Sequence, residues 1–109
     1  MLDKKYRLPR GARIKNGAIF SSRFFLLKTK KNKEQYSRFG FVVSKKISKS
    51  AVVRNRIKRQ IRRCIEENLN NIINGVDMLF MVKKESIDAN TDEISLSLNE
   101  LFKQKNLIK

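Results

Sequence analysis

The sequence predicts an α/β fold, an α+β sandwich in which a small mixed sheet of three to four strands packs against two to three helices. Three observations lead to this prediction. Two runs rich in aromatic and aliphatic residues come first, a long amphipathic segment follows, and a short apolar run with a second amphipathic segment comes last. No linker divides the 109 residues, so residues 1–109 are expected to form a single domain.

The first two strands are expected at residues 19–29 and 36–46. The runs IFSSRFFLLKT and YSRFGFVVSKK are rich in the residue types that favour strands. The polar stretch 30–35 between them is short, so the two strands are expected to pair as an antiparallel hairpin. Proline and glycine interrupt any periodic pattern in residues 1–17, which are expected to be largely irregular with a short helical turn near 10–16.

Residues 51–73 predict an amphipathic helix. Apolar residues recur there in steps of three and four, and Ser50 is well placed to cap the first turn. Asn74 and Gly75 are typical of a helix stop. At 1.5 Å per residue the helix would be about 35 Å long.

A third strand and a last helix are expected after this segment. The largely apolar run at 76–84, VDMLFMVKK, is typical of a buried strand. The helix before it would then be a crossover that joins two parallel strands. Asn90 and Glu93 have the spacing of a capping box and predict the start of the last helix. Its apolar face contains Ile94, Leu98, Leu101 and Phe102.

Charge is distributed very unevenly along the chain. Residues 1–63 carry 21 Lys and Arg against two acidic residues, whereas residues 64–109 carry five Lys against eight acidic residues. This asymmetry, within a net charge of +16, predicts a polyanionic partner, with nucleic acid preferred over an anionic membrane. No apolar run approaches the roughly 20 residues needed to span a membrane, and no membrane partner is expected.

Cations are concentrated in the segment AVVRNRIKRQIRRC, which has six of them within residues 51–64. On a helix they occupy the face opposite the apolar residues, close to the positive end of the helix dipole. Five like-charge pairs three or four residues apart would cost about 0.2–0.5 kcal/mol each. An external anion would relieve this repulsion, and the arginine fork suits phosphate. The alternative is a helix face that is merely solvated.

The stretch FVVSKKISKSAVVRNRIKRQIRR at 41–63 resembles the signature of the protein subunit of bacterial ribonuclease P, and RLPR, FFLLK and GVDMLFMVKK extend the resemblance over nearly the whole chain. The resemblance implies that magnesium ions and the RNA subunit cleave the phosphodiester at the 5′ end of mature tRNA. It implies that the protein binds the ribonuclease P RNA and holds the single-stranded 5′ leader of precursor tRNA in a cleft between the basic helix and the sheet. It also implies a left-handed crossover, against the general rule.

The resemblance assigns candidate site residues. RNA contacts are expected from Lys45, Lys46, Arg54, Asn55, Arg56, Lys58, Arg59 and Arg62. The candidates for the leader cleft are Phe20, Phe24, Phe25 and Lys28, because aromatic rings beside cations stack on single-stranded bases. Phe24 and Phe25 are adjacent and would point to opposite faces of a strand, so at most one of them would face the cleft. A place in the core is the alternative for each phenylalanine.

No catalytic residue is expected on this chain. It has no histidine, Cys64 is its one cysteine and lies on the apolar face of the expected helix, and no carboxylate pair is obviously placed for metal-ion catalysis. This agrees with the resemblance, which implies that magnesium is bound mainly by the RNA subunit and that no protein partner is required. One cysteine and no secretory signal favour a cytoplasmic location.

Two other functions fit the residues alone. One is an RNA-binding module without a catalytic partner, such as a ribosomal protein or an RNA chaperone. The other is a duplex-DNA binder that inserts the basic helix into the major groove. The aromatic strand beside the basic helix favours single-stranded RNA over DNA, and only the motif separates ribonuclease P from a ribosomal protein.

Overall fold

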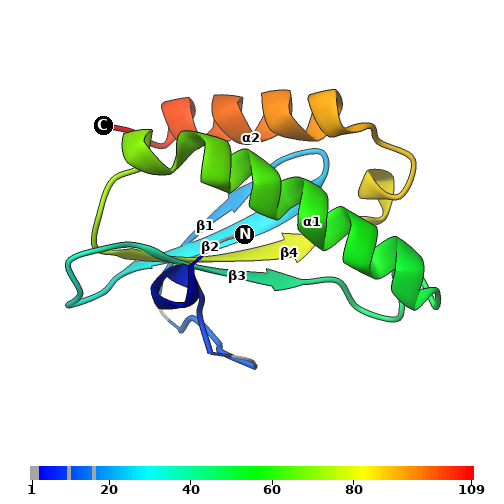
Figure 1. Cartoon of the computed structure of the whole chain (residues 1–109), viewed down its shortest axis with the longest axis horizontal. Helices are drawn as coiled ribbons and strands as arrows, with labels where there is room; N and C mark the ends of the chain where they lie inside the picture. The colour runs from blue at the N-terminus through cyan, green and yellow to red at the C-terminus, as the bar shows by residue number, and fades with distance from the viewer. Residues whose placement is uncertain (1–2, 10, 16) are drawn as a thin grey trace.

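The computed structural model describes residues 3–9, 11–15 and 17–109, and it shows a four-stranded sheet with two helices on one face (Figure 1). The strands are β1 (Ala18–Ser21), β2 (Phe25–Lys31), β3 (Arg38–Val42) and β4 (Val76–Val82), and the helices are α1 (Ala51–Asn68) and α2 (Thr91–Gln104). The described residues also form short 3₁₀ helices, namely η1 (Lys4–Tyr6), η2 (Leu69–Asn71) and η3 (Lys84–Ser86). The predicted mixed sheet with two helices is confirmed.

The region 19–29 forms two strands and not the single strand expected. The chain bends at residues 22–24, where the Ser22 hydroxyl donates to Phe25 O at 3.2 Å and accepts from Phe25 N at 3.3 Å. β1 and β2 then pair antiparallel, with Ala18 opposite Thr29. The two serines inside the aromatic run are a turn signal, and they outweigh the strand preference of their neighbours.

The sheet order is β1-β2-β4-β3, so the predicted hairpin between the first two expected strands is wrong. β4 lies between β2 and β3, and it pairs antiparallel with β2 along the whole length of both strands. β4 is the most apolar strand, and a central place covers both of its edges. β3 and β4 are parallel and are joined through α1, which confirms the predicted crossover. The left hand of that crossover stays a prediction.

α1 begins where the sequence predicts and ends earlier. The Ser50 hydroxyl accepts from Val53 N at 3.3 Å, which confirms the N-cap. The helix has 18 residues, about 27 Å, because Asn68 Nδ2 bonds Cys64 O at 2.8 Å and η2 follows at once. Ile72 keeps the helical spacing of apolar residues, but it is buried through an antiparallel bridge to Ile108.

The start of α2 and its buried face are as predicted. Asn90 Oδ1 accepts from Glu93 N at 2.8 Å and Glu93 Oε1 accepts from Asn90 N at 3.4 Å, which completes the capping box. The four residues predicted for its apolar face are buried. Two acidic residues stand in the first turn of α2, whereas the first turn of α1 has none. Acidic residues therefore stabilise the positive end of the helix dipole in α2, whereas the first turn of α1 has no such residue.

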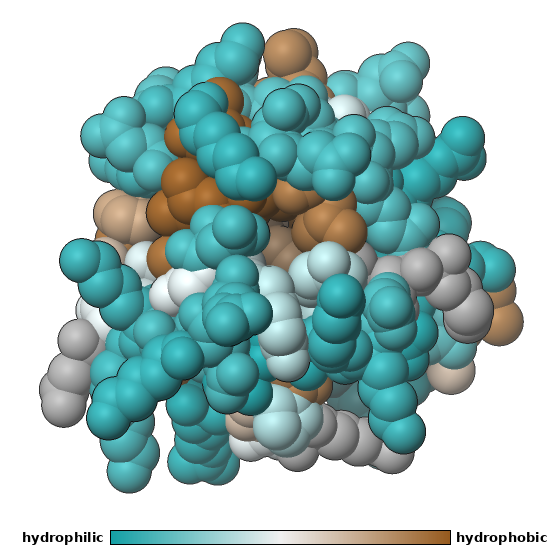
Figure 2. All heavy atoms as spheres, turned by 60° about the vertical axis from the view of Figure 1, so that its left-hand side comes forward, coloured by the Kyte–Doolittle hydropathy of each residue, from teal (hydrophilic) through white to brown (hydrophobic). Residues whose placement is uncertain are grey.

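The core lies between the sheet and the two helices. The Phe80 ring on the central strand contacts the rings of Phe25, Phe41 and Phe102, with centroids 5.6–6.4 Å apart. Cys64 is buried in the same layer, as predicted, and burial raises the pKa of its thiol. In Figure 2, hydrophilic side chains cover most of the face shown, and hydrophobic residues gather in its upper part.

Segments outside the sheet and helices are short. A short helical turn was expected near residues 10–16. The described residues there show one turn-type hydrogen bond, from Ala12 N to Pro9 O at 3.0 Å. Residues 10 and 16 lie outside the described residues. Within the described part of the chain, no helix has the length and apolar character needed to cross a membrane.

Candidate nucleic-acid interface

The polar residues of α1 lie on two sides of its buried stripe. The stripe consists of Ile57, Ile61, Cys64 and Ile65, which pack into the core. We call Arg56, Gln60 and Arg63 the closed flank, and Asn55, Lys58, Arg59 and Arg62 the open flank. At 100° per residue the two flanks fall on opposite sides of the stripe.

The closed flank is bonded to the protein itself. Arg56 Nη2 donates to Ile87 O at 2.6 Å, and Gln60 Nε2 donates to Thr91 Oγ1 at 3.2 Å. Ile87 lies in the segment before α2 and Thr91 is the first residue of α2, so this flank fastens α1 to the start of α2. Arg63 pairs with Glu67 at 3.2 Å.

Arg54, at the start of the helix, is also bonded within the chain. Its Nη1 donates to Ser48 O at 2.8 Å in the loop before the helix. The assignment of Arg54 and Arg56 as RNA contacts stays a prediction, and each guanidinium already donates a hydrogen bond to a backbone carbonyl of the chain. Arg54 bonds the loop before α1, and Arg56 bonds the connection between β4 and α2.

The open flank is arranged differently. Its four residues and Val52 line a shallow hollow of about 410 Å³. Among the described residues, neither Lys58 nor Arg59 makes a hydrogen bond or an ion pair. The Arg62 guanidinium lies 5.6 Å from the centroid of the Phe41 ring on β3, and its buried Nε has no hydrogen-bond partner. Val52, beside these cations, is 75% exposed.

Lys45 and Lys46 are exposed in the turn between β3 and α1. β3 ends at Val42, earlier than expected, and the turn that holds the two lysines is closed by a 3.0 Å hydrogen bond from Ile47 N to Ser44 O. The two lysines therefore precede the N-terminus of α1 on a loop and not on the strand.

The phenylalanine candidates for the leader cleft are mostly in the core. Phe24 and Phe25 are 4% and 0% exposed, so their assignment to a base-stacking surface is wrong. The bend at residues 22–24 removes Phe24 from the strand alternation, and both rings therefore turn inward. Phe20 is half-buried against the core, with Lys105 Nζ 5.2 Å from its ring centroid.

The expected cleft between the basic helix and the sheet is also wrong, because the buried stripe of α1 fills that space. A hollow of about 540 Å³ lies on the other face of the sheet. It is lined by the cations Arg13, Lys15 and Lys28, the apolar residues Val42, Leu79 and Met81, and Gly11, Ala12 and Ile14. We call this hollow the open-face groove. Of the four predicted leader residues, Lys28 is the one that lies in it.

The continuous apolar run of β4 concealed this groove in the sequence. Residues at alternate positions of a strand face opposite sides of the sheet. Leu79 and Met81 therefore face away from the helices, while Met78 and Phe80 are fully buried beneath them. Periodicity alone cannot distinguish such a strand from one buried on both faces.

Asp77 is held by one cation and one amide at the start of β4. Arg38 donates from Nε and Nη2 to its two carboxylate oxygens, both at 2.9 Å, and Asn32 Nδ2 donates to Oδ1 at 2.8 Å. Burial alone would raise the pKa of Asp77, but the hydrogen bonds from Arg38 and Asn32 and the charge of Arg38 lower it below its ordinary value. The same contact raises the pKa of Arg38. The sequence suggests only a turn or cap role for this aspartate.

The fold and the surface together define a small α+β protein in which one helix presents cations that the chain itself does not neutralise. The family model described as Ribonuclease P matches residues 4–106. The chain belongs to the ribonuclease P protein family, whose members are protein components of the ribonuclease that processes the 5′ leaders of tRNA.

Individual relatives agree with this assignment. The chain is 41% identical over 96 residues to the ribonuclease P protein component of Fusobacterium nucleatum, covering 84% of this chain and 86% of that protein. It is 38% identical over 107 residues to that of Staphylococcus epidermidis, covering 94% and 91%. The structure of a Staphylococcus aureus RNase P protein mutant with defective mRNA degradation activity is similar with a TM-score of 0.86, at 33% identity over 97% of this chain and 92% of that one.

Proposed function

We propose that this chain binds the RNA subunit of ribonuclease P through the open flank of α1, with Lys45 and Lys46 as neighbouring contacts. The observation that carries the proposal is a contrast within one helix. Lys58 and Arg59 have no hydrogen-bond or ion-pair partner among the described residues, while Arg56 is bonded to Ile87, before α2, and Gln60 to the first residue of α2. Phosphates fit the open flank because closely spaced anions would offset its repulsion.

Arg62 strengthens the proposal. Its guanidinium already lies over the Phe41 ring, which restricts its orientation. A guanidinium held in this way is ready to donate to a phosphate without losing much conformational freedom. Asn55 lines the same hollow and has an amide that can both donate and accept.

The open-face groove is the proposed binding site for the 5′ leader of precursor tRNA. Arg13, Lys15 and Lys28 would contact phosphates, and the apolar floor of Val42, Leu79 and Met81 would contact sugars and bases. No phenylalanine lines the groove among the described residues. Binding there would therefore depend more on charge, and hence on salt, than on stacking.

Cleavage itself is proposed to occur on the RNA subunit with bound magnesium ions. In this proposal the chain supplies no catalytic residue and requires no further protein partner. What supports this is the chemistry of both surfaces, since lysine and arginine hold phosphates and repel divalent cations. A cytoplasmic location stays a prediction from the sequence.

Reconstitution tests the proposal. The chain is mixed with a bacterial ribonuclease P RNA and a leader-bearing precursor tRNA at low magnesium. We expect faster cleavage and tighter substrate binding than with RNA alone, and no cleavage by the protein alone. With 6–10 phosphate contacts, affinity should fall about 10³–10⁵-fold between 50 and 200 mM salt.

A matched pair of variants makes the test specific. Lys58→Gln/Arg59→Gln should abolish most of the stimulation, whereas Lys84→Gln/Lys103→Gln removes the same charge from exposed sites elsewhere and should preserve it. Equal effects of the two pairs would contradict the proposal. Tight binding to ribosomal RNA or duplex DNA with no effect on cleavage would favour the other two functions.

A further inference from the structure

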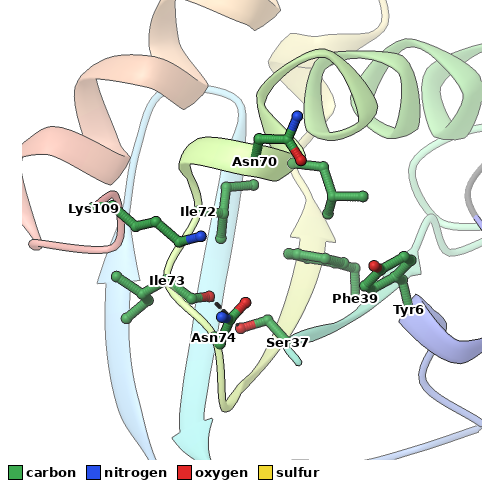
Figure 3. A pocket seen from close by; sticks show the side chains of 9 residues that line it. Tyr6, Ser37, Phe39, Asn70, Ile72, Ile73, Asn74 and Lys109 are labelled. Carbon is green, nitrogen blue, oxygen red and sulfur yellow. Dashed lines mark hydrogen bonds between the residues drawn. The ribbon is translucent and has the colours of Figure 1, made fainter. Parts of the chain in front are cut away.

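The chain crosses the edge of the sheet beside β3, before the first strand begins. Leu8 N donates to Phe39 O at 2.8 Å, and Arg7 forms a parallel bridge with Phe39, so this segment covers the edge of β3 (Figure 1). Figure 3 shows Tyr6 beside Phe39 in a small pocket at this end of the sheet. Leu8 reaches the opposite face, where a Cβ added to Gly40 would lie 3.1 Å from Leu8 Cδ1.

An aromatic and cationic cluster, which we call the β3-edge cluster, is built at this crossing by Lys4, Lys5, Tyr6 and Tyr36. The two tyrosine rings meet edge to face with centroids 5.7 Å apart, although they come from η1 and from the loop before β3. Lys5 Nζ lies 5.0 Å from the Tyr6 centroid and 5.8 Å from the Tyr36 centroid.

A hollow of about 450 Å³ adjoins the cluster. Its lining consists of Lys4, Lys5, Arg7, Leu8, Pro9, Glu34, Tyr36 and Arg38. The nearby carboxylates leave positive charge in excess. Asp77 is engaged by Arg38, and Asp3 accepts from the backbone N of Lys4 at 2.7 Å as the cap of η1. Among the described residues, Glu34 is the one carboxylate in this lining, which also contains Lys4 and Lys5.

Two other surfaces meet β3 farther along the strand. On one side of β3, Arg62 of the open flank lies over Phe41. On the other side, Val42 lines the open-face groove. The cluster, at the start of β3, and these two surfaces, near its end, therefore share one edge strand.

We propose that the β3-edge cluster binds a single-stranded segment of RNA, with Lys4 and Lys5 on phosphates and a tyrosine ring against a base. Both tyrosines are partly buried. Cations beside partly exposed aromatic rings suit the two parts of a nucleotide, whereas an acidic peptide would use only the cations. Lys5 would leave the rings for a phosphate, since a cation–π contact at an exposed site is weak. This inference rests on the proposed function and adds a contact remote from α1.

Tyrosine fluorescence gives a direct readout. The chain has two tyrosines and no tryptophan, and both tyrosines belong to the cluster. A short single-stranded oligoribonucleotide should quench the emission of the full chain as it binds, and Tyr36→Leu should lose at least half of the quenching. Unchanged emission at saturation, with binding verified by the anisotropy of labelled RNA, would overturn the proposal. Equally tight binding of an acidic peptide would overturn it as well.

Affinity measurements show which RNA the cluster contacts, ribonuclease P RNA or the leader of precursor tRNA. Lys4→Gln/Lys5→Gln should weaken binding about 3- to 10-fold and reduce the salt slope by about 1–2, while Lys84→Gln/Lys103→Gln should change neither. If Lys4→Gln/Lys5→Gln binds ribonuclease P RNA alone more weakly than wild type does, the cluster contacts that RNA. If the variant weakens substrate binding by the reconstituted enzyme only when the precursor tRNA carries its leader, the cluster contacts the leader.

A parallel variant separates the two claims. If Lys4→Gln/Lys5→Gln binds every RNA as wild type does while Lys58→Gln/Arg59→Gln loses binding, the cluster proposal fails and the proposed function stands. If neither pair weakens binding, both fail.

Discussion

On the closed flank of α1, Arg56 donates to Ile87 O at 2.6 Å, just before α2, and Gln60 donates to Thr91 Oγ1 at 3.2 Å, at the start of α2. On the open flank, Lys58 and Arg59 extend from the same helix and make no such bond with the described residues. The residue types on the two flanks are similar, so composition does not explain the difference. It arises from the neighbour that each flank meets, which is α2 on one side and a shallow hollow on the other. An arginine-rich helix can therefore divide its cations between holding the fold and binding a partner.

The largest expected effect comes from removing cations of the open flank. In Lys58→Gln/Arg59→Gln we expect affinity for ribonuclease P RNA to fall about 10- to 100-fold, because two phosphate contacts are lost. The salt slope should fall by about 2. Filter binding at several salt concentrations measures both quantities. A weaker affinity with an unchanged slope would mean that the two residues do not contact phosphates.

The closed flank should respond in the opposite way. Arg56→Met removes the bond to Ile87 O and should lower the free energy of unfolding by about 1–2 kcal/mol. For a domain of this size that is a fall in Tm of about 4–15 °C. The salt slope of RNA binding should remain that of wild type. A normal Tm with a reduced slope would place Arg56 on the RNA.

These two flanks show what the sequence could and could not predict. The cap at Ser50, the capping box at Asn90 and the parallel crossover follow from local patterns that need no knowledge of neighbours. Strand order does not, because alternation gives the face of a strand and not its partner, and the hairpin prediction failed for that reason. The helix wheel places Arg56 beside Gln60 and away from Lys58, but it does not show that α2 packs there.

Only part of the site could be predicted, again because local patterns do not show which segments pack together. The position of the basic helix follows from its charge pattern, whereas Phe24 was misplaced because the bend at residues 22–24 breaks the alternation. The open-face groove requires residues 11–15 to lie over Leu79 and Met81 of β4, which is a long-range contact. Local patterns carry no signal for it.

Acid sensitivity is a smaller effect that belongs to neither flank. The lowered pKa of Asp77 means that its contribution to stability is complete above the ordinary aspartate pKa of about 3.9 and declines as the pH falls below it. The contribution is lost once the pH is below the lowered pKa of the folded state. Asp77→Asn should therefore be less stable than wild type by about 1–2 kcal/mol near pH 7, with the difference shrinking in acid. Denaturant unfolding at a series of pH values measures it, and a difference that grows in acid would contradict the assignment.

The smallest expected effect concerns the groove. Lys28→Gln should weaken the binding of leader-bearing precursor tRNA by the reconstituted enzyme a few-fold, because one cation of several is lost. Binding of tRNA that lacks the leader should not change. Equal weakening of both substrates would remove Lys28 from the leader site.

The central claim is that the open flank is electrostatically strained until RNA neutralises it. Thermal unfolding of wild type and of Lys58→Gln/Arg59→Gln at low salt, with and without ribonuclease P RNA, tests it most directly. We expect the variant to be as stable as wild type or slightly more stable alone, because like-charge pairs are removed, and to gain much less stability from the RNA. A variant that unfolds at a clearly lower temperature alone, yet is stabilised by RNA as strongly as wild type, would contradict the claim.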